Sequence, residues 1–215
     1  MAIVTMILGE SGSGKSASLR NFDPDHTLLI QAMKKPLPFR STGWKELDRN
    51  GGNIFPTDRH DKIIAAMKRS KRKVIVIDDF QYVLANEYMR RTDETGYAKF
   101  TEIGCHAWDI LMAAAALEPD VRVYVLSHTE STEAGKTKIK TIGKMLDEKI
   151  TLEGMVTIVL RTTVRDGEYF FSTKNSGSDT VKSPMGLFDS DLIENDLAVV
   201  DAAIFNYFEL TEATA

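Results

Sequence analysis

The chain has 215 residues, of which 43% are hydrophobic and 27% are charged, and its formal net charge at pH 7 is −4. This composition is typical of globular proteins, and we expect one domain over residues 1–215 with a sizeable core. It excludes a strongly basic nucleic-acid-binding domain, and no apolar run approaches the roughly 20 residues of a membrane span, so we expect no membrane association.

The first part of the chain alternates apolar runs with helical patterns. Runs rich in β-branched residues predict buried strands at 2–8, 27–33, 74–80 and 121–130. Helices are predicted at about 15–21, from residue 58 onward, from 81 to a break at 92–96, and at 100–118. Residues 34–57 are rich in Pro and Gly and are expected to be irregular.

The remainder predicts a hairpin and a closing helix. Residues 132–144 are polar and basic and are expected to form a loop or hairpin, whereas 145–154 has a helical pattern. Strands at 155–164 and 167–175 are joined by the Asp166-Gly167 turn. A loose loop at 176–186 precedes an amphipathic helix at 196–210. The order predicts an α/β fold with a mainly parallel central sheet sandwiched by helices and a C-terminal β-hairpin.

Cysteine usage indicates the compartment. The chain has one cysteine, Cys105, which excludes an internal disulfide and a cysteine-based metal cluster. The first residues lack a basic leader and are not expected to be a signal peptide, so we expect a cytoplasmic protein. Cys105 lies in an apolar helical stretch and is expected in the core.

A glycine-rich segment follows the first predicted strand. "GESGSGKS" fits the phosphate-binding pattern G-x-x-x-x-G-K-[ST] at every fixed position, and its strand–loop–helix context argues against a chance Gly/Ser linker. Glycines let backbone N–H groups turn toward a phosphate, and the helix adds its dipole. We expect Lys15 to reach the β- and γ-phosphates in a catalytic role and Ser16 to bind Mg²⁺. The residues expected to hold the nucleotide are Gly9, Glu10, Ser11, Gly12, Ser13, Gly14, Lys15, Ser16 and Ala17.

An acidic pair ends the third predicted strand, in "VIVIDDF". A P-loop enzyme needs such a carboxylate to hold Mg²⁺, and we assign this role to Asp78. Asp79 could polarise the attacking water, or it could only cap the following helix. The fourth strand, "VYVLSHTE", ends in Ser127 and His128. Their order predicts contact with the γ-phosphate or the water, so His128 is a candidate catalytic residue, although a histidine there could also be a surface residue.

The P-loop, "VIVIDDFQY", "VLSHTE", "GKMLDEKITLEGMVTIVLRT" and "STKNSGSD" together resemble the phage nucleotide-binding proteins of the RecA-like P-loop ATPase class, from about residue 3 to 185. Members of the Sak group act as single-strand annealing recombinases. The resemblance implies a RecA-like core that binds ATP and Mg²⁺. It also implies a homo-oligomer, a ring or filament, with active sites at subunit interfaces and the host cytoplasm as location.

The resemblance also implies individual roles. A lysine after the late strand reaches the neighbour's γ-phosphate in RecA-type ATPases, and Lys174 stands at that place as a catalytic residue. RecA has a second lysine two residues later, where this chain has Ser176. RecA also carries a glutamate after its second core strand, where this chain offers Gln31 and no acid. Water activation therefore shifts to Asp79, or hydrolysis is slow.

RecA-like proteins bind single-stranded DNA through two loops that flank the sensor strand. Basic residues neutralise phosphates and aromatic residues can stack on bases, although charge runs are usually solvated faces. The first loop offers Arg90, Arg91 and Lys99, and the second offers Lys136, Lys138, Lys140 and Lys144. The basic run at 67–73 could instead favourably end a helix.

Three functions follow from these patterns. The first is an ATPase that binds single-stranded DNA and promotes annealing or recombination, with a single-strand binding protein as a further candidate partner. The second is an ATP-switch partner protein without significant hydrolysis. The third is a P-loop small-molecule kinase, which is disfavoured because Arg161 and Arg165 are the only arginines after Arg122 and lie in a predicted hairpin rather than a lid.

Overall fold

The computed structural model describes residues 1–143, 146 and 149–211. The strands are β1 (Ile3–Gly9), β2 (Thr27–Gln31), β3 (Ile54–Pro56), β4 (Val74–Asp78), β5 (Arg122–Ser131), β6 (Thr137–Ile139), β7 (Ile158–Arg165), β8 (Glu168–Ser172) and β9 (Leu192–Glu194). The α-helices are α1 (His60–Arg69), α2 (Gln81–Arg90), α3 (Ala98–Ala115) and α4 (Leu197–Tyr207), and the 3₁₀ helices are η1 (Ser16–Asn21) and η3 (Leu152–Met155).

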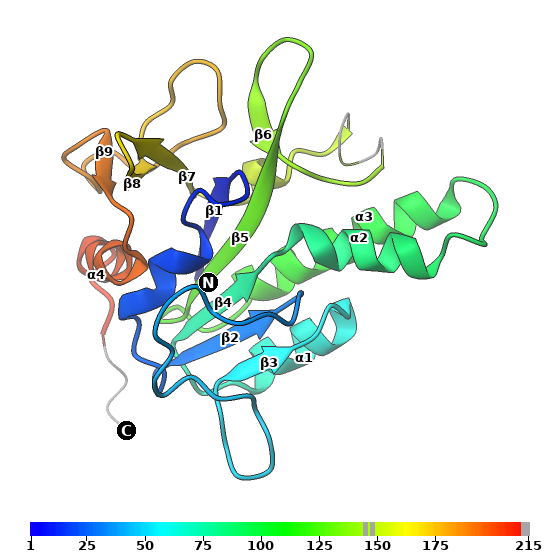
Figure 1. Cartoon of the computed structure of the whole chain (residues 1–215), viewed down its shortest axis with the longest axis horizontal. Coiled ribbons are helices and arrows are strands. Elements are labelled where there is room, and N and C mark those ends of the chain that lie inside the picture. Colours follow the sequence, from blue (N-terminus) through cyan, green and yellow to red (C-terminus); the bar gives the residue numbers. More distant parts are fainter. Residues whose placement is uncertain (144–145, 147–148, 212–215) are drawn as a thin grey trace.

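The strands form one sheet in the order β3-β2-β4-β5-β1-β7-β8-β9, with β6 paired to the end of β5 (Figure 1). From β3 to β7 every neighbouring pair is parallel, whereas β8 and β9 continue the sheet antiparallel. Strands β2 and β4 are buried at every position, as expected for parallel strands covered on both faces. The predicted α/β fold with a mainly parallel sheet is confirmed.

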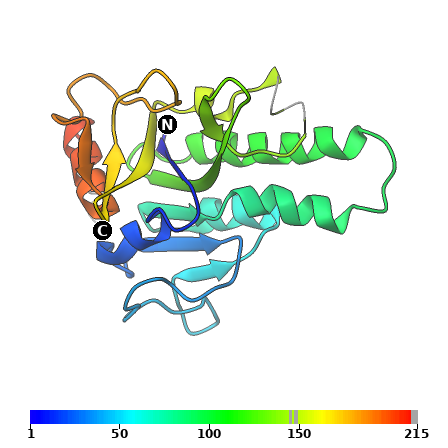
Figure 2. The same ribbon diagram turned by 45° about the horizontal axis from the view of Figure 1, so that its top comes forward.

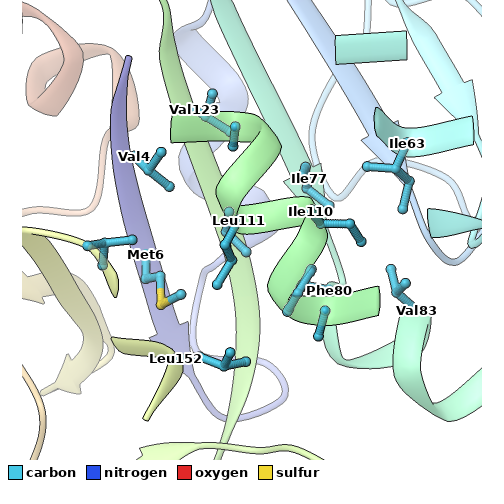
Figure 3. Close-up of a cluster of buried hydrophobic side chains, with 14 of the residues drawn as sticks. Val4, Met6, Ile63, Ile77, Phe80, Val83, Ile110, Leu111, Val123 and Leu152 are labelled. Carbon is cyan, nitrogen blue, oxygen red and sulfur yellow. The ribbon is translucent and has the colours of Figure 1, made fainter. Parts of the chain in front are cut away.

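Helices cover both faces of the sheet (Figures 1 and 2). On one face, Ile63 of α1, Val83 of α2 and Ile110 of α3 pack in a cluster with sheet residues such as Val123 (Figure 3). On the other face, η1 and α4 join a second buried cluster that contains Leu19 and Ile204. The predicted sandwich is therefore confirmed, and no helix among the described residues is long and apolar enough to cross a membrane.

The first four predicted strands agree with the structure to within two residues, and so does the break between α2 and α3. The predicted hairpin is β7–β8, and Asp166 and Gly167 have φ of 53° and 83°, as a two-residue type I′ turn requires. The basic segment after β5 turns back as β6, whose pairing with β5 makes it a hairpin.

Several expectations need correction. Cys105 is exposed, because the buried face of α3 contains Ile103 and Ala107 and the residue between them points away. The segment 176–186 is anchored by the buried Asp179 and an antiparallel bridge between Val159 and Lys182. Strand β9 follows it and was not predicted. The segment 34–57, expected to be irregular, contains strand β3, which pairs in parallel with β2. Of the predicted helix 145–154, residues 145, 147 and 148 lie outside the described part, and the described remainder contains the short 3₁₀ helix η3 at Leu152–Met155.

Parallel strands β1, β4 and β5 all end at the same edge of the sheet. The register places Gly9 opposite His128 and Gln31 opposite Asp78. The phosphate-loop residues, the acidic pair and the sensor residues therefore converge there.

Candidate phosphate-binding site

The glycine-rich loop leaves β1 at Gly9 and enters η1 at Ser16. Lys15 is buried, and its Nζ donates to the carbonyl oxygens of Gly9 at 2.8 Å and Glu10 at 2.7 Å. Gly14 has a backbone φ of +98°, which residues other than glycine rarely adopt. The predicted short helix at about 15–21 is the 3₁₀ helix η1 of six residues, and Lys15 is the one cationic residue in the loop before it.

Strand β7 holds the base of this loop. A Cβ on Gly9 would lie 1.8 Å from Thr162 Oγ1 and 2.6 Å from Ser13 Oγ, and these two hydroxyls lie 2.6 Å from each other. Ser13 Oγ also lies 2.6 Å from the Glu10 carbonyl oxygen. The first glycine of the motif is therefore required by close packing against β7.

Gly9→Ala is expected to destabilise the fold by about 2 kcal/mol, because the added methyl overpacks against Thr162. Thr162→Ala in the same chain should recover part of this loss by removing the nearest atom. Chemical denaturation of the two single variants and the double variant measures the coupling. Additive losses would show that the Gly9–Thr162 contact does not restrict the loop.

The loop meets the acidic pair through a direct hydrogen bond. Ser16 Oγ donates to Asp78 Oδ1 at 3.0 Å, and the Asp79 N–H donates to the same oxygen at 3.0 Å. Asp78 is 1% exposed, and its Oδ2 has no hydrogen-bond partner among the described residues. A serine hydroxyl beside a buried, half-satisfied carboxylate fits Mg²⁺, which binds one or two protein oxygens and completes its shell with phosphates and water.

Burial and the nearby charge of Asp79 raise the pKa of Asp78 to about 6. Burial also lowers the pKa of Lys15 to about 8, although Asp78 and Asp79 attract its charge. Both ionised groups are therefore held at a cost to the fold, as is common where a site is prepared for a charged ligand.

Asp78→Asn is expected to raise the free energy of unfolding of the nucleotide-free protein by about 3 kcal/mol at neutral pH. Between the ordinary pKa of 3.8 and the folded-state pKa of about 6, folded wild type binds a proton that the unfolded chain has released. Wild type therefore loses stability as pH rises through this window, whereas the variant does not. Denaturation from pH 4 to 8 should show a difference that grows and then levels off; a constant difference would contradict this.

Asp79 lies in the left-handed region, with a φ of 61°. Its Oδ2 lies 2.5 Å from Lys35 Nζ and its Oδ1 lies 3.7 Å from His128 Nε2. Burial alone would raise the pKa of Asp79, but hydrogen bonds from His128 and Lys35 outweigh it and lower that pKa. Helix α2 has no side-chain hydrogen bond at its N-cap among the described residues, so the helix-capping alternative for the Asp79 side chain is not supported.

The sensor strand β5 lies between β1 and β4. Ser127 is fully buried opposite Leu8, and its Oγ has no hydrogen-bond partner among the described residues. The His128 ring packs edge-on against Tyr82 and is partly buried beside Asp79. Of the two candidates, only His128 lines the cavity described next.

A cavity of about 1030 Å³ opens over the loop. Its loop residues are Ser11, Gly12, Gly14, Lys15, Ser16 and Ala17, and Asp79 and His128 also line it. Gly9, Glu10, Ser13 and Asp78 support this wall without lining it.

The cavity is also lined by residues that the sequence did not indicate. Arg20 of η1 lines the cavity and pairs with Glu194 at 2.9 Å, and its guanidinium donates to the Asn195 carbonyl oxygen. The Asn195 side chain is buried, and its Nδ2 has no hydrogen-bond partner among the described residues. Tyr169 lies beside Gly14, where an added Cβ would come within 2.9 Å of its ring.

Lys174 follows β8 on an exposed segment, where its Nζ lies 2.5 Å from Asp191 Oδ1. It is not among the described residues that line the cavity. Lys174 therefore does not contribute to the lining of this cavity within one chain.

The candidate DNA-binding residues divide into two groups. Arg90 pairs with Asp58, Arg91 pairs with Glu87, Glu94 and Glu102, and Lys99 is buried and donates to backbone carbonyls. In the second loop, Lys138 pairs with Glu130, whereas Lys136 and Lys140 are exposed. Lys144 lies outside the described residues. Both arginines of the first group are therefore paired with carboxylates and Lys99 is buried, whereas Lys136 and Lys140 of the second group are accessible.

A comparison with protein-family models found no match, and neither did a comparison with curated proteins.

Proposed function

We propose that the chain is an ATPase of the RecA-like P-loop class that acts on single-stranded DNA in annealing or recombination. One observation carries the nucleotide part: the loop serine, Ser16, donates to the buried Asp78 at the end of β4, beside the buried Lys15. These residues belong to two separate motifs and meet at one edge of the sheet with the residue types that Mg²⁺ and a triphosphate need.

The chain's own residues divide the work. Lys15 would exchange its two carbonyl contacts for contacts with the β- and γ-phosphates. Ser16 and Asp78 would hold Mg²⁺, which would neutralise phosphate charge. Asp79, with a lowered pKa, stays ionised at neutral pH and can accept a hydrogen bond from the attacking water. His128 lies on the same side of the cavity and orients Asp79 or the γ-phosphate.

The strand order supports the RecA-like assignment. The loop strand β1 and the acidic strand β4 are separated by β5, so the sensor residue stands between the two motifs. A γ-phosphate sensor at the end of β5 can therefore contact both the loop after β1 and the acidic pair after β4.

The β5–β6 hairpin supports a link to DNA. The Lys140 N–H donates to the His128 carbonyl oxygen at 2.8 Å, so a basic, exposed residue is joined directly to the sensor residue. DNA phosphates held by Lys136 and Lys140 would therefore restrain His128 and change the rate of hydrolysis. A ring or filament would add the contacts of several such hairpins.

The test is ATP turnover with and without a single-stranded oligonucleotide across a salt series. We expect a DNA-stimulated rate whose stimulation falls with salt. The double variant Lys136→Gln/Lys140→Gln should lose most of the stimulation, whereas the matched exposed variant Lys68→Gln should keep it. Absence of turnover in every condition would refute the ATPase, and turnover indifferent to DNA would refute the DNA role.

Lys174→Ala is expected to leave ATP binding by the monomer intact and to reduce turnover in the assembly at least about 10-fold, because the lysine would act on the neighbour's γ-phosphate. Titration calorimetry at low protein concentration and turnover at high concentration separate the two effects. Unchanged turnover in the assembly would remove the trans role.

One observation favours the ATP-switch alternative. Lys35 pairs with Asp79 across 2.5 Å and occupies the carboxylate that would activate water. If Lys35 stays there with ATP bound, hydrolysis is slow and binding alone sets the state. A measurement of phosphate release over time tests this alternative. A switch should release less than one phosphate per site, whereas an ATPase should continue through many turnovers.

A further inference from the structure

Two histidines and a glutamate meet on the face of the sheet that α1, α2 and α3 cover, away from the phosphate-binding cavity. His60 is the first residue of α1, Glu87 lies in the penultimate turn of α2, and His106 lies in the middle of α3. All three side chains are partly buried, so water and ions can reach them. Figure 1 shows the three helices on the same side of the molecule.

The three side chains are in mutual contact. His106 Nδ1 lies 2.9 Å from both carboxylate oxygens of Glu87, and the rings of His60 and His106 stack with centroids 3.6 Å apart and planes 9° apart. One ligand atom from each residue lies within 4.8 Å of the other two. Ligand atoms around tetrahedral Zn²⁺ are about 3.3 Å apart, so the separations must adjust and one ring must change its orientation before this set closes around an ion.

The donor set is selective in its chemistry. Two imidazoles and one carboxylate are the ligands of many zinc sites that keep a fourth position for water, whereas Mg²⁺ and Ca²⁺ prefer oxygen ligands alone. Burial and the neighbouring His106 lower the pKa of His60, which favours the neutral imidazole that a metal requires.

Arg91 supports the Glu87 carboxylate from outside the cluster. Arg91 Nη1 donates to Glu87 Oε1 at 3.1 Å and holds the carboxylate in position, while its other contacts are to Glu94 and Glu102. Partners of this kind orient the ligands of a metal site.

We propose that His60, Glu87 and His106 bind a divalent transition-metal ion of the Zn²⁺ type, which joins α1, α2 and α3. A metal ion lies in the plane of each imidazole that binds it, and two nearly parallel planes 3.6 Å apart share no such point. Binding therefore turns one ring out of the stack. The His60 ring, at the start of its helix, turns more freely than the His106 ring in the middle of α3.

The test uses the full chain without nucleotide and Zn²⁺ or Co²⁺ as the probe. Titration calorimetry should give one Zn²⁺ site, and Co²⁺ should give the visible absorption of a four-coordinate ion. His60→Gln and His106→Gln should each weaken binding at least about 10-fold, as should Glu87→Gln. Zn²⁺ should also raise the melting temperature of wild type and of none of these variants.

The other histidines provide controls. His26 is exposed and pairs only with Asp23 among the described residues, so His26→Gln should bind Zn²⁺ as wild type does. If His128→Gln removes the site, the metal binds at the phosphate-binding edge and the proposal is wrong. NMR of the histidine rings in wild type requires no variant: Zn²⁺ should shift His60 and His106, and shifts at His26 or His128 alone would overturn the proposal.

Discussion

Replacing Lys15 by alanine is expected to abolish tight binding of ATP·Mg²⁺. The variant loses charge-assisted hydrogen bonds to two phosphates, which together are worth at least about 3 kcal/mol, or more than 100-fold in affinity. Because Lys15 is buried and its pKa is lowered to about 8, its ammonium group is only partly compensated by the two carbonyl oxygens in the nucleotide-free protein. The fold should therefore tolerate the change far better than the ligand does.

Titration calorimetry with ATP and Mg²⁺ measures this loss directly. Lys68→Ala is a suitable control, because Lys68 is an exposed lysine of α1 outside the cavity. Wild-type affinity in the Lys15 variant would place the triphosphate elsewhere and remove the basis of the proposed function.

The second large effect is expected at Asp79. Asp79→Asn should lower ATP turnover about 100-fold or more, because the amide cannot accept the proton of an attacking water. Asparagine is the right replacement, since it tolerates the left-handed backbone that Asp79 adopts at a φ of 61°. ATP affinity should not fall, because the change frees Lys35 to contact the phosphates.

Asp166→Asn provides a matched control. Asp166 also has a positive φ, of 53°, but lies in the exposed β7–β8 turn. Single-turnover phosphate release from the two variants separates the loss of the carboxylate from any effect of the backbone. Equal rates in wild type and the Asp79 variant would leave water activation to another group and favour the ATP-switch alternative.

The sequence was sufficient for the parts of the site that depend on consecutive residues. The loop is one uninterrupted motif, and a run of apolar residues placed Asp78 at a strand end before any pairing was known. Because parallel strands end at one edge, the meeting of Ser16 and Asp78 could be expected without knowing the register.

The parts that were missed depend on pairings between distant segments. Lys35 lies in an irregular segment rich in Pro and Gly, and nothing local directs it to Asp79. Asn195 and Tyr169 reach the loop only because β8 and β9 extend the sheet beyond β7. The pattern of apolar and polar residues along the chain does not predict that these two residues contact the loop.

Counting basic residues along the sequence also failed to show which of them are paired with carboxylates. The sequence shows Arg91 as part of a basic stretch. In the fold, however, Glu87, Glu94 and Glu102 all lie within 3.1 Å of its guanidinium. Spacings of three and four residues make the first two pairings predictable in hindsight, since such residues are neighbours on or near a helix. The contact with Glu102 requires the turn between α2 and α3.

The position of β1 in the sheet has a consequence for biogenesis. Ile3 is paired with Arg122 and Thr5 with Ile158, so β1 is synthesised long before either of its partner strands. Such non-local pairing gives a high contact order and slow folding. Until β5 and β7 have been made, the apolar β1 has two unpaired edges, which exposes a nascent chain of this kind to aggregation.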